Sequence, residues 1–188
     1  MTRLTYYTAT TLDGFIADPS DSLDWLLRQP NDEDGALAYD EFIADVGAIV
    51  MGSTTYTWVL DHEDGAWSYT MPAWVMTSRD LPLPRTEGAD VRFASGDVRP
   101  VYQAMAEAAG GKDLWVVGGG ELAGAFADAG LLDEVVVYVA PVVLGAGSPL
   151  LPRRLDLELV ETGRNQAFVA SRYRVVGPLA EDRSGEVG

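Results

Sequence analysis

Residues 114–126 read LWVVGGGELAGAF and place three local signals side by side. An apolar run typical of a buried strand, Asp113–Val117, meets three glycines at 118–120, and a helical pattern follows over Glu121–Ala129. Glycines at the top of a strand permit positive φ angles and close approach of a ligand, while the next helix start offers free N–H groups and a positive dipole. The unit predicts a site for an anionic group such as a pyrophosphate. A tight turn without any ligand explains the glycines equally well.

The alternation of strand and helix continues upstream of this unit. Strands are expected at Leu4–Ala9, Ala48–Met51, Ala73–Met76 and Val91–Phe93, and helices at Ala36–Asp45, around Tyr56–Val59 and at Val101–Ala109. Downstream, strands follow one another without helices between them, at Val135–Val139, Leu157–Thr162 and Phe168–Val176. We therefore expect an α/β fold with a mostly parallel, helix-covered sheet and an antiparallel C-terminal edge.

Turn and cap chemistry predicts how these elements connect. Leu12-Asp13-Gly14 has the composition of a sharp turn after the first strand. The acidic segment Asp18–Asp34 is expected to be an irregular loop with a short buried turn at Leu23, Trp25, Leu26 and Leu27. The hydroxyls of residues 53–55 are expected to cap the short helix that follows Gly52. We assign residues 1–177 to one domain and expect the polar residues 178–188 to be a flexible tail.

The composition excludes several classes of function. Thirteen basic residues stand against 29 acidic ones, and the formal charge of −16 repels nucleic acid and anionic membranes. The chain has no cysteine and one histidine, His62, so we expect no metal site and interpret His62 as a surface residue. No apolar run is long enough to span a membrane, and no leader pattern opens the chain. We expect a cytoplasmic protein.

Four motifs in a fixed order resemble the series found across the dihydrofolate reductase superfamily. They are TATTLDGFIA at 8–17, VMGSTTY at 50–56, VMTSRD at 75–80 and WVVGGGELAGAF at 115–126. A fifth segment, DEVVVYVAPVVLGAGSPLLP at 133–152, is similar to the reductase domain of riboflavin biosynthesis and its stand-alone relatives. The resemblance extends roughly over residues 3–176.

This resemblance implies a sheet of about eight strands, with helices on both faces and NADPH across the C-terminal ends of its parallel strands. By analogy, Ala9 and the loop with Gly14, Phe15 and Ile16 would cover the nicotinamide. The phosphates would be held by Gly52, Ser53, Thr54, Thr55, Gly118, Gly119, Gly120, Glu121 and Leu122. Thr77, Ser78 and Arg79 match the segment that contacts the adenosine 2′-phosphate. Many members carry arginine where this chain has Ser53, so the preference for NADPH over NADH could be relaxed.

The reaction that the resemblance implies is hydride transfer to a small molecule with a C=N or C=O bond. Asp40 is the candidate proton donor, although it does not align cleanly with the family's carboxylate, and a surface acid explains it equally well. Trp25 and Trp58 are candidates for stacking on a flat substrate, with a place in the core as the alternative. A non-catalytic protein that binds a nucleotide or small ligand on the same fold is the competing hypothesis.

Two further expectations concern the substrate and the assembly. Reductases specific for folate hold its carboxylate with an arginine between the second and third strands, but this chain has neither lysine nor arginine between Arg28 and Arg79. We therefore expect dihydrofolate to be a poor substrate and a neutral or cationic acceptor to fit better. The resemblance and the apolar run Val135–Leu151 also predict a homodimer.

Overall fold

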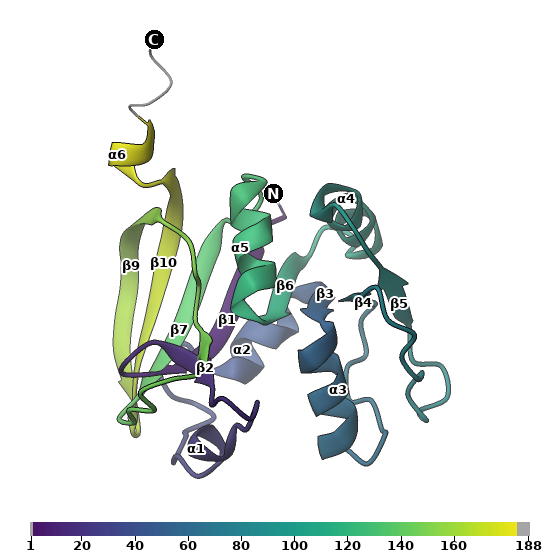
Figure 1. The fold of residues 1–188 in the computed structure, drawn as a ribbon, viewed down its shortest axis with the longest axis horizontal. Coiled ribbons are helices and arrows are strands. Elements are labelled where there is room, and N and C mark those ends of the chain that lie inside the picture. Colours follow the sequence, from purple (N-terminus) through teal and green to yellow (C-terminus); the bar gives the residue numbers. More distant parts are fainter. Residues whose placement is uncertain (1, 184–188) are drawn as a thin grey trace.

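The computed structural model describes residues 2–183 and confirms the expected fold class. Eight strands form one sheet in the order β5-β4-β3-β6-β1-β7-β10-β9 (Figure 1). In chain order they are β1 (Leu4–Thr11), β3 (Val46–Gly52), β4 (Ala73–Met76), β5 (Val91–Ala94), β6 (Asp113–Gly118), β7 (Glu134–Ala140), β9 (Leu155–Asn165) and β10 (Phe168–Pro178). All neighbours from β5 to β7 are parallel, whereas β10 is antiparallel to both β7 and β9.

Helices cover both faces of the sheet. Four of them pack on it: α2 (Tyr39–Ala44), α3 (Ser53–His62), α4 (Val98–Ala108) and α5 (Gly120–Asp128). One core cluster joins α4 and α5 to alternate residues of the central strands and includes Met105, Phe126, Val50 and Val116. The opposite cluster joins α2 and α3 to the intervening residues, such as Ile49 and Met51. The period-two alternation of the strands therefore sends successive side chains into two separate cores.

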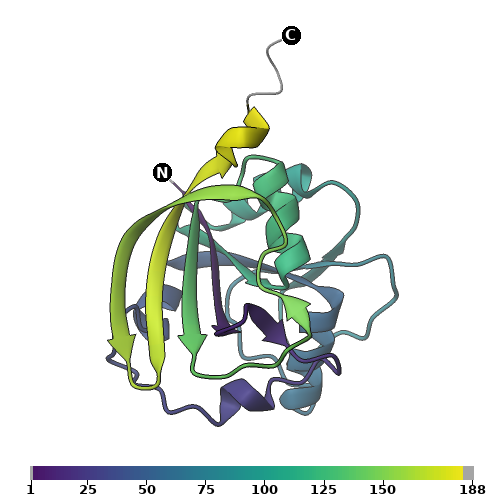
Figure 2. The same cartoon turned by 60° about the vertical axis from the view of Figure 1, so that its left-hand side comes forward.

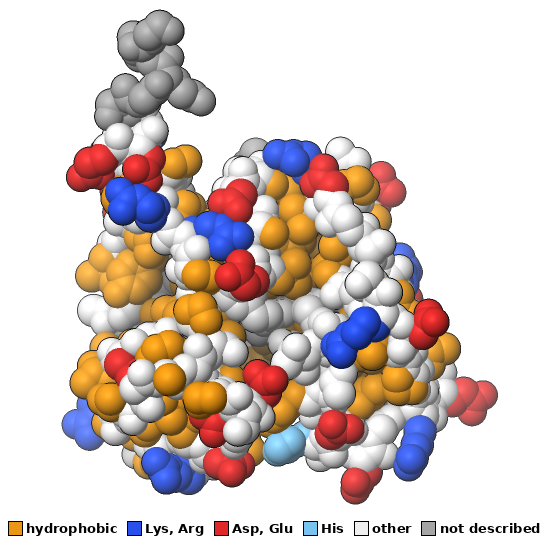
Figure 3. Space-filling view, viewed as in Figure 1, with side chains coloured by type: hydrophobic (Ala, Val, Ile, Leu, Met, Phe, Trp, Pro, Cys, Tyr) orange, Lys and Arg blue, Asp and Glu red, His pale blue; other side chains and the backbone are white. Residues whose placement is uncertain are grey.

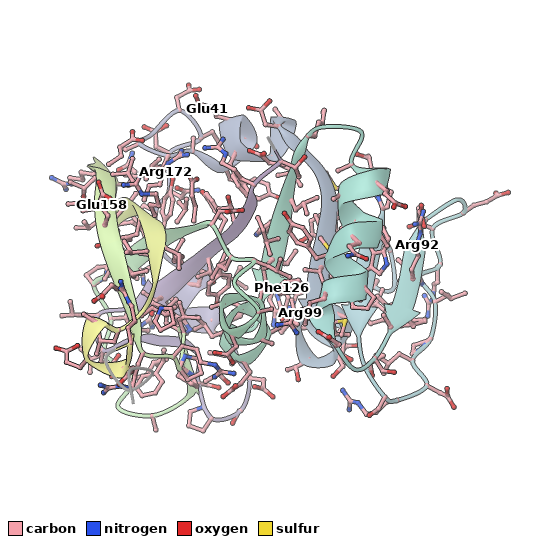
Figure 4. The ribbon with its side chains drawn as sticks, turned by 90° about the horizontal axis from the view of Figure 1, so that it is seen from above. Glu41, Arg92, Arg99, Phe126, Glu158 and Arg172 are labelled. Atoms are coloured by element: carbon pink, nitrogen blue, oxygen red, sulfur yellow. The ribbon has the colours of Figure 1, made fainter. Side chains whose placement is uncertain are left out.

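The sheet runs the length of the molecule, from the short edge strand β5 to the long edge strand β9. Figure 4 shows Arg92 at the β5 end and Glu158 with Arg172 at the β9 end, with Phe126 on α5 near the middle. Strand β7 and the antiparallel strands β10 and β9 curve away from the rest of the sheet (Figure 2). Their curvature leaves the lower ends of β1 and β7 beside a small two-stranded sheet.

That small sheet was not expected from the sequence. It pairs β2 (Phe15–Ala17) antiparallel with β8 (Ser148–Pro149) and fixes the loop after β1 against the segment before β9. Strands of three and two residues are too short to show a period, so only the long-range pairing reveals them.

Two helix starts also differ from expectation. The hydroxyl caps predicted for α3 are wrong, because Gly52 is the cap residue and no side chain bonds to the first turn. Helix α4 begins earlier than expected, at Val98, because the Asp97 carboxylate accepts a hydrogen bond from the backbone N–H of Arg99. Pro100 is accommodated there because the first turn of a helix does not need its N–H.

The remaining elements lie at the periphery. The segment expected as an irregular loop contains one helical turn, α1 (Asp24–Leu27), and β10 is followed by α6 (Ala180–Arg183). Arg154 pairs with Asp182 of α6 at 2.8 Å. The rest of the predicted tail, residues 184–188, lies outside the described residues, and its flexibility stays a prediction. Within residues 2–183, no helix has the length and apolar character to span a membrane.

Candidate functional site

A cavity of about 960 Å³ lies at the carboxyl ends of the parallel strands. The ends of β1, β3, β4 and β6 all reach it, and Figure 3 shows the molecule hollowed between the α3 side and the β2 side. The lining includes most of the predicted cofactor residues: Ala9, Ile16, Gly52, Ser53, Thr54, Thr55, Gly118, Gly119, Gly120, Glu121 and Leu122. Segments that are up to about a hundred residues apart in the sequence thus meet because parallel strands share one edge.

Two helices begin at one end of this cavity. Helix α3 starts after Gly52 and α5 starts after Gly119, and neither N-terminus is bonded to a capping side chain. The first N–H groups of both helices therefore remain available, with the positive ends of two helix dipoles beside them. This end, which we call the cofactor end, can hold anionic groups through backbone N–H donors.

The three glycines of the strand-to-helix turn have different surroundings. Gly119 has a φ of −92°, which any residue adopts, so the expected need for a positive φ angle is wrong at this position. A Cβ on Gly119 would be 3.6 Å from Ile16 across the cavity, an ordinary contact. A Cβ on Gly120 would be 2.3 Å from the carbonyl oxygen of Pro149. Gly120 is therefore required for packing against β8, whereas Gly119 leaves its backbone open to the cavity.

One acidic side chain lines the cofactor end, and it is paired. Glu121 lies in the first turn of α5, where its carboxylate accepts a hydrogen bond of 3.1 Å from Arg153. The same guanidinium binds Asp128, the last residue of α5, at 2.7 Å. Arg153 thus offsets the charge of Glu121 next to the helix terminus that would receive an anion.

The loop after β1 closes one side of the cavity and is held by Asp13. Its carboxylate accepts hydrogen bonds from the Thr11 hydroxyl at 2.5 Å and from the backbone N–H groups of Leu144 and Gly145, at 3.1 and 2.7 Å. These bonds, that of Thr11 foremost, lower the pKa of Asp13. Ile16 lines the cavity, whereas the neighbouring Gly14 and Phe15 do not.

The predicted 2′-phosphate segment lies immediately beyond the cavity. Thr77, Ser78 and Arg79 follow Met76, which lines the cavity and pairs in register with Gly52. The Thr77 hydroxyl accepts a hydrogen bond of 2.9 Å from the backbone N–H of Arg79. The Arg79 side chain is exposed, and its guanidinium bonds to no other residue of the part of the chain that the structure describes.

Aromatic rings line the other end of the cavity, which we call the substrate end. The Tyr7 ring centroid is 6.0 Å from that of Tyr39, 6.5 Å from that of Trp115 and 5.7 Å from that of Tyr138. Tyr69 and Phe168 extend this set, at 5.8 Å from Trp115 and 5.5 Å from Tyr138. Leu23, Leu26, Leu27, Gln29, Asn31 and Trp58 complete the substrate end.

The polar atoms of the inner rings are already bonded to the backbone. The Tyr7 hydroxyl donates to the Leu37 carbonyl at 3.0 Å, and the Tyr138 hydroxyl donates to the Ala36 carbonyl at 2.7 Å. The Trp115 Nε1–H donates to the Tyr7 carbonyl at 3.1 Å. These three rings therefore offer mainly their apolar surfaces to a ligand.

Tyrosine hydroxyls at this end stay protonated over the physiological range. Burial, followed by the negative charges of Asp40 and Glu63, raises the pKa of Tyr39 to about 12. Burial likewise raises the pKa values of Tyr69 and Tyr7. Neutral phenols can donate a hydrogen bond but contribute no charge.

The three predicted catalytic and substrate residues have different positions. Trp58 lines the cavity and stacks on His62, with ring centroids 3.9 Å apart. Trp25 is 4% exposed and packs with Phe168 and Ala140, away from the lining, which favours its alternative as a core residue. Asp40 is exposed on α2 and does not line the cavity, which favours the alternative of a surface acid.

Most of the substrate end was not found from the sequence. Tyr7 and Tyr138 lie within strands whose apolar pattern shows only that they are buried on one face. Tyr39, Tyr69 and Phe168 come from three other regions of the chain. No local signal connects these residues, because their proximity results from strand order.

Comparison with known proteins identifies a family whose model matches more than half of the chain. The RibD C-terminal domain matches residues 58–166. The uncharacterized protein YwjB of Bacillus subtilis (strain 168) is 30% identical over 150 residues, which are 77% of this chain and 79% of YwjB. The riboflavin biosynthesis protein RibD of Corynebacterium ammoniagenes is 31% identical over 161 residues, or 78% of this chain and 45% of that protein.

A solved structure shows the same fold. It is the crystal structure of a protein from Shewanella sp. PV-4 with a provisional riboflavin biosynthesis assignment. It superposes with a TM-score of 0.78 at 27% identity, covering 93% of this chain and 99% of the other. The resemblance inferred from the ordered motifs is therefore confirmed at the level of fold and family.

Proposed function

The chain belongs to the family of the RibD C-terminal domain, and from this membership we propose that it is an NADPH-dependent reductase. It would transfer a hydride to a small molecule that carries a C=N or C=O bond. The observation that supports this most is the meeting of two uncapped helix N-termini at the cavity, beside the open backbone of Gly119. Such a site suits an extended anionic cofactor.

The chain's residues would bind NADPH in three groups. The N–H groups that follow Gly52 and Gly119 would hold its phosphates, and the loop with Ile16 would cover the nicotinamide at Ala9. Thr77, Ser78 and Arg79 would hold the 2′-phosphate through a guanidinium and hydroxyls. NADPH supplies a hydride when it is bound.

The substrate end would orient the acceptor and keep water from the reacting carbon. The six linked aromatic rings give it an apolar floor. Neither Asp40 nor any other acid of the α2 helix lines the cavity; the two acids that do, Asp21 and Glu121, belong to the segment before α1 and to the first turn of α5. We propose that the proton for the product heteroatom comes from water.

Binding of NADPH is the direct test. Titration should quench the fluorescence of Trp58 and Trp115, both of which line the cavity, and the signal should saturate. Gly119→Val should abolish saturable binding, because its side chain would fill the open backbone face, while circular dichroism shows an intact fold. Absence of saturation in the wild-type protein, by fluorescence and by calorimetry, would refute the proposal.

A non-catalytic protein on this fold remains the second candidate, since Asp40, the candidate proton donor, does not line the cavity. An NADPH oxidation screen separates the two. Consumption of NADPH that depends on an added imine, quinone or pterin supports the enzyme. Saturable NADPH binding without turnover of any acceptor supports the binding protein.

We also propose that the protein is a homodimer, for a reason that differs from the sequence-based one. Only the β7 part of the run Val135–Leu151 is covered by the chain itself, since Val135–Tyr138 are buried whereas Val143 is 65% exposed. Exposed apolar side chains also lie on β9 and β10, where Figure 3 shows part of the apolar surface: Leu157, Leu159, Val160, Val169 and Val176. A second copy would cover this surface.

Light scattering at micromolar concentration tests the assembly. The wild-type protein should have the mass of a dimer, and Leu159→Glu should shift it to the monomer because a carboxylate is costly to bury. Leu83→Glu, at an exposed leucine on another face, should leave the dimer intact. A monomeric wild-type protein would contradict the proposal.

A further inference from the structure

We propose that the substrate end selects flat, uncharged conjugated rings that carry the carbonyl or imine group, and that it discriminates against acceptors bearing an anionic group. This inference rests on the proposed function, because it names the substrate class of the same site. It follows from the charge, helix ends and ring surfaces of the cavity lining.

Positive side chains are missing from the lining. Among residues 2–183, no lysine, arginine or histidine lines the cavity, and its two charged residues are the acids Asp21 and Glu121. Glu121 is at the cofactor end and is paired with Arg153. An anionic group at the substrate end would therefore find no cation to bind, in a chain of formal charge −16.

Backbone N–H groups do not replace the missing cations at this end. At the cofactor end, two helices of ten and nine residues begin with free N–H donors. At the substrate end the adjoining helices are α1 and α2, of four and six residues. The first turn of α2 carries Asp40 and Glu41, whose charges oppose an anion at that terminus. The cavity thus accepts anions at one end and disfavours them at the other.

Flat aromatic rings provide much of the surface at the substrate end. The hydroxyls of Tyr7 and Tyr138 and the Nε1–H of Trp115 all bond to backbone carbonyls, so these rings meet a ligand with carbon surface. Trp58 adds an indole from α3. Aromatic rings favour stacked or edge-to-face contact with another conjugated ring.

Neutral hydrogen-bond donors complete the selectivity. Tyr39 and Tyr69 line the cavity, and their phenols are protonated at neutral pH, as the raised pKa of each indicates. A phenol can donate a hydrogen bond to a carbonyl oxygen or imine nitrogen without a compensating charge. An uncharged ring carbonyl or imine therefore meets both apolar surface and a donor.

The reaction balances with the cofactor class already proposed. A hydride from NADPH adds to the electrophilic ring system, the π bond breaks, and a proton from water neutralises the oxygen or nitrogen. The acceptor is reduced by two electrons, and NADPH becomes NADP⁺. For a quinone, two carbonyl groups become the two hydroxyls of a hydroquinone, with one hydrogen from NADPH and one from water.

Two quinones with the same ring system test the inference. Protein saturated with NADP⁺ is titrated with menadione, which is neutral, and with 1,4-naphthoquinone-2-sulfonate, which is anionic. Quenching of tryptophan fluorescence reports binding without requiring turnover. Menadione should bind at least about tenfold more tightly, a difference of about 1.4 kcal/mol. Added salt should reduce the difference between the two affinities, because it screens the repulsion between the sulfonate and the negatively charged protein.

A cation introduced into the lining provides the matched test. Leu27 lines the substrate end and is 57% exposed, so Leu27→Arg adds a guanidinium with little disturbance of the core. This variant should bind the sulfonate about tenfold more tightly than wild type and menadione about equally. Leu83→Arg adds the same charge at a leucine 65% exposed and outside this cavity, and it should change neither affinity.

The outcomes separate this inference from the proposed function. If NADP⁺ binds but the sulfonate binds as tightly as menadione, or neither quinone binds, the inference is overturned and the cofactor proposal stands. If NADP⁺ itself does not bind, the proposed function fails and the inference fails with it.

Discussion

Gly118, Gly119 and Gly120 follow one another in the sequence, but each has different neighbouring atoms. Only Gly120 faces backbone that cannot move aside, the carbonyl oxygens of Pro149 and Leu150 at 2.3 and 2.4 Å from an added Cβ. Gly120→Ala should therefore lower the free energy of unfolding by about 1–3 kcal/mol, the range typical of overpacking. Urea denaturation measures the loss.

Gly119→Ala is the matched control for this prediction. Its Cβ would be 3.6 Å from Ile16, an ordinary contact, and its φ of −92° suits alanine. We expect its unfolding free energy to stay within about 0.5 kcal/mol of wild type, as for most substitutions away from strained sites. Equal losses for both variants would show that contact with the 149–150 backbone is not the reason for glycine at position 120.

Arg79 provides a residue-scale test of cofactor preference. Its exposed guanidinium lies just beyond the cavity and is not paired within residues 2–183, so it is available to a phosphate monoester. Arg79→Ala should weaken NADPH binding about tenfold, the lower range for a charged hydrogen bond, because solvent screens an exposed pair. Binding of NADH, which lacks the extra phosphate, should change little.

The measurement is the ratio of the NADPH and NADH dissociation constants by calorimetry. Arg85→Ala removes a guanidinium that bonds to the Asp64 carbonyl, on the wall of a different cavity, and should leave the ratio unchanged. Equal losses of NADPH and NADH affinity in Arg79→Ala would show that Arg79 acts on something other than the 2′-phosphate.

At the scale of elements, Asp13 adds a side-chain link between the turn after β1 and the loop after β7, beside the β2–β8 pairing. Its carboxylate holds the β1–β2 turn to the N–H groups of Leu144 and Gly145. Asp13→Ala should weaken NADPH binding several-fold while the sheet stays folded. The loop with Ile16 would keep its pairing with β8 but lose the Asp13 hydrogen bonds, so its ordering on binding would cost more conformational entropy. Calorimetry and circular dichroism measure the two effects.

The pH dependence of this attachment has a defined sign. The pKa of Asp13 is lower in the folded protein than in the unfolded chain. The stability that its ionised carboxylate contributes is therefore present above the ordinary aspartate range and is lost as the pH falls through the folded pKa.

The control for Asp13→Ala is Asp97→Ala, which removes another exposed carboxylate that accepts a backbone N–H, at the start of α4. If that control weakened NADPH as much as Asp13→Ala does, the loop attachment would not be the cause.

At the scale of the whole molecule, folding brings tyrosines from distant segments into one apolar site. Burial raises the pKa values of Tyr7, Tyr39 and Tyr69 above the value of about 10 for an unfolded chain. Their protonated forms therefore contribute stability that is complete below pH 10. It is lost as the pH rises from there through the folded values, because only the unfolded state then ionises freely.

We expect the thermal midpoint to fall steeply above pH 10. Tyr39→Phe should reduce the slope of this fall between pH 10 and 12, since the pKa of Tyr39 is about 12 and phenylalanine does not titrate. Differential scanning calorimetry of the two proteins at pH 8, 10 and 11 measures it. Parallel curves for wild type and variant would contradict the assigned cause.

The sequence by itself determined the order along the chain of the main-sheet strands and their covering helices. It also determined the residues of the cofactor end of the cavity. Each of these features rests on neighbouring residues: apolar periods mark β3 and β6, and glycines followed by a helical pattern mark the two turns that we propose bind phosphate. Parallel strands carry such turns to the same edge of a sheet, so the strand pattern predicts that Gly52 and Gly119 lie at one edge. Their direct proximity follows from the pairing of β3 with β6.

Only the tertiary structure decided the substrate end and the exposed surface. Tyr7, Tyr138 and Phe168 meet because β1, β7 and β10 are neighbours, and Tyr39 joins them from α2. Tyr69 reaches the same site from the segment before β4, through Trp115 of β6, and no local pattern contains this arrangement. Burial likewise depends on strand order: the apolar β7 is covered because it lies between β1 and β10, whereas leucines of the edge strand β9 remain exposed. Local sequence fixes the period and the turns, but contacts between distant segments depend on which elements become neighbours in space.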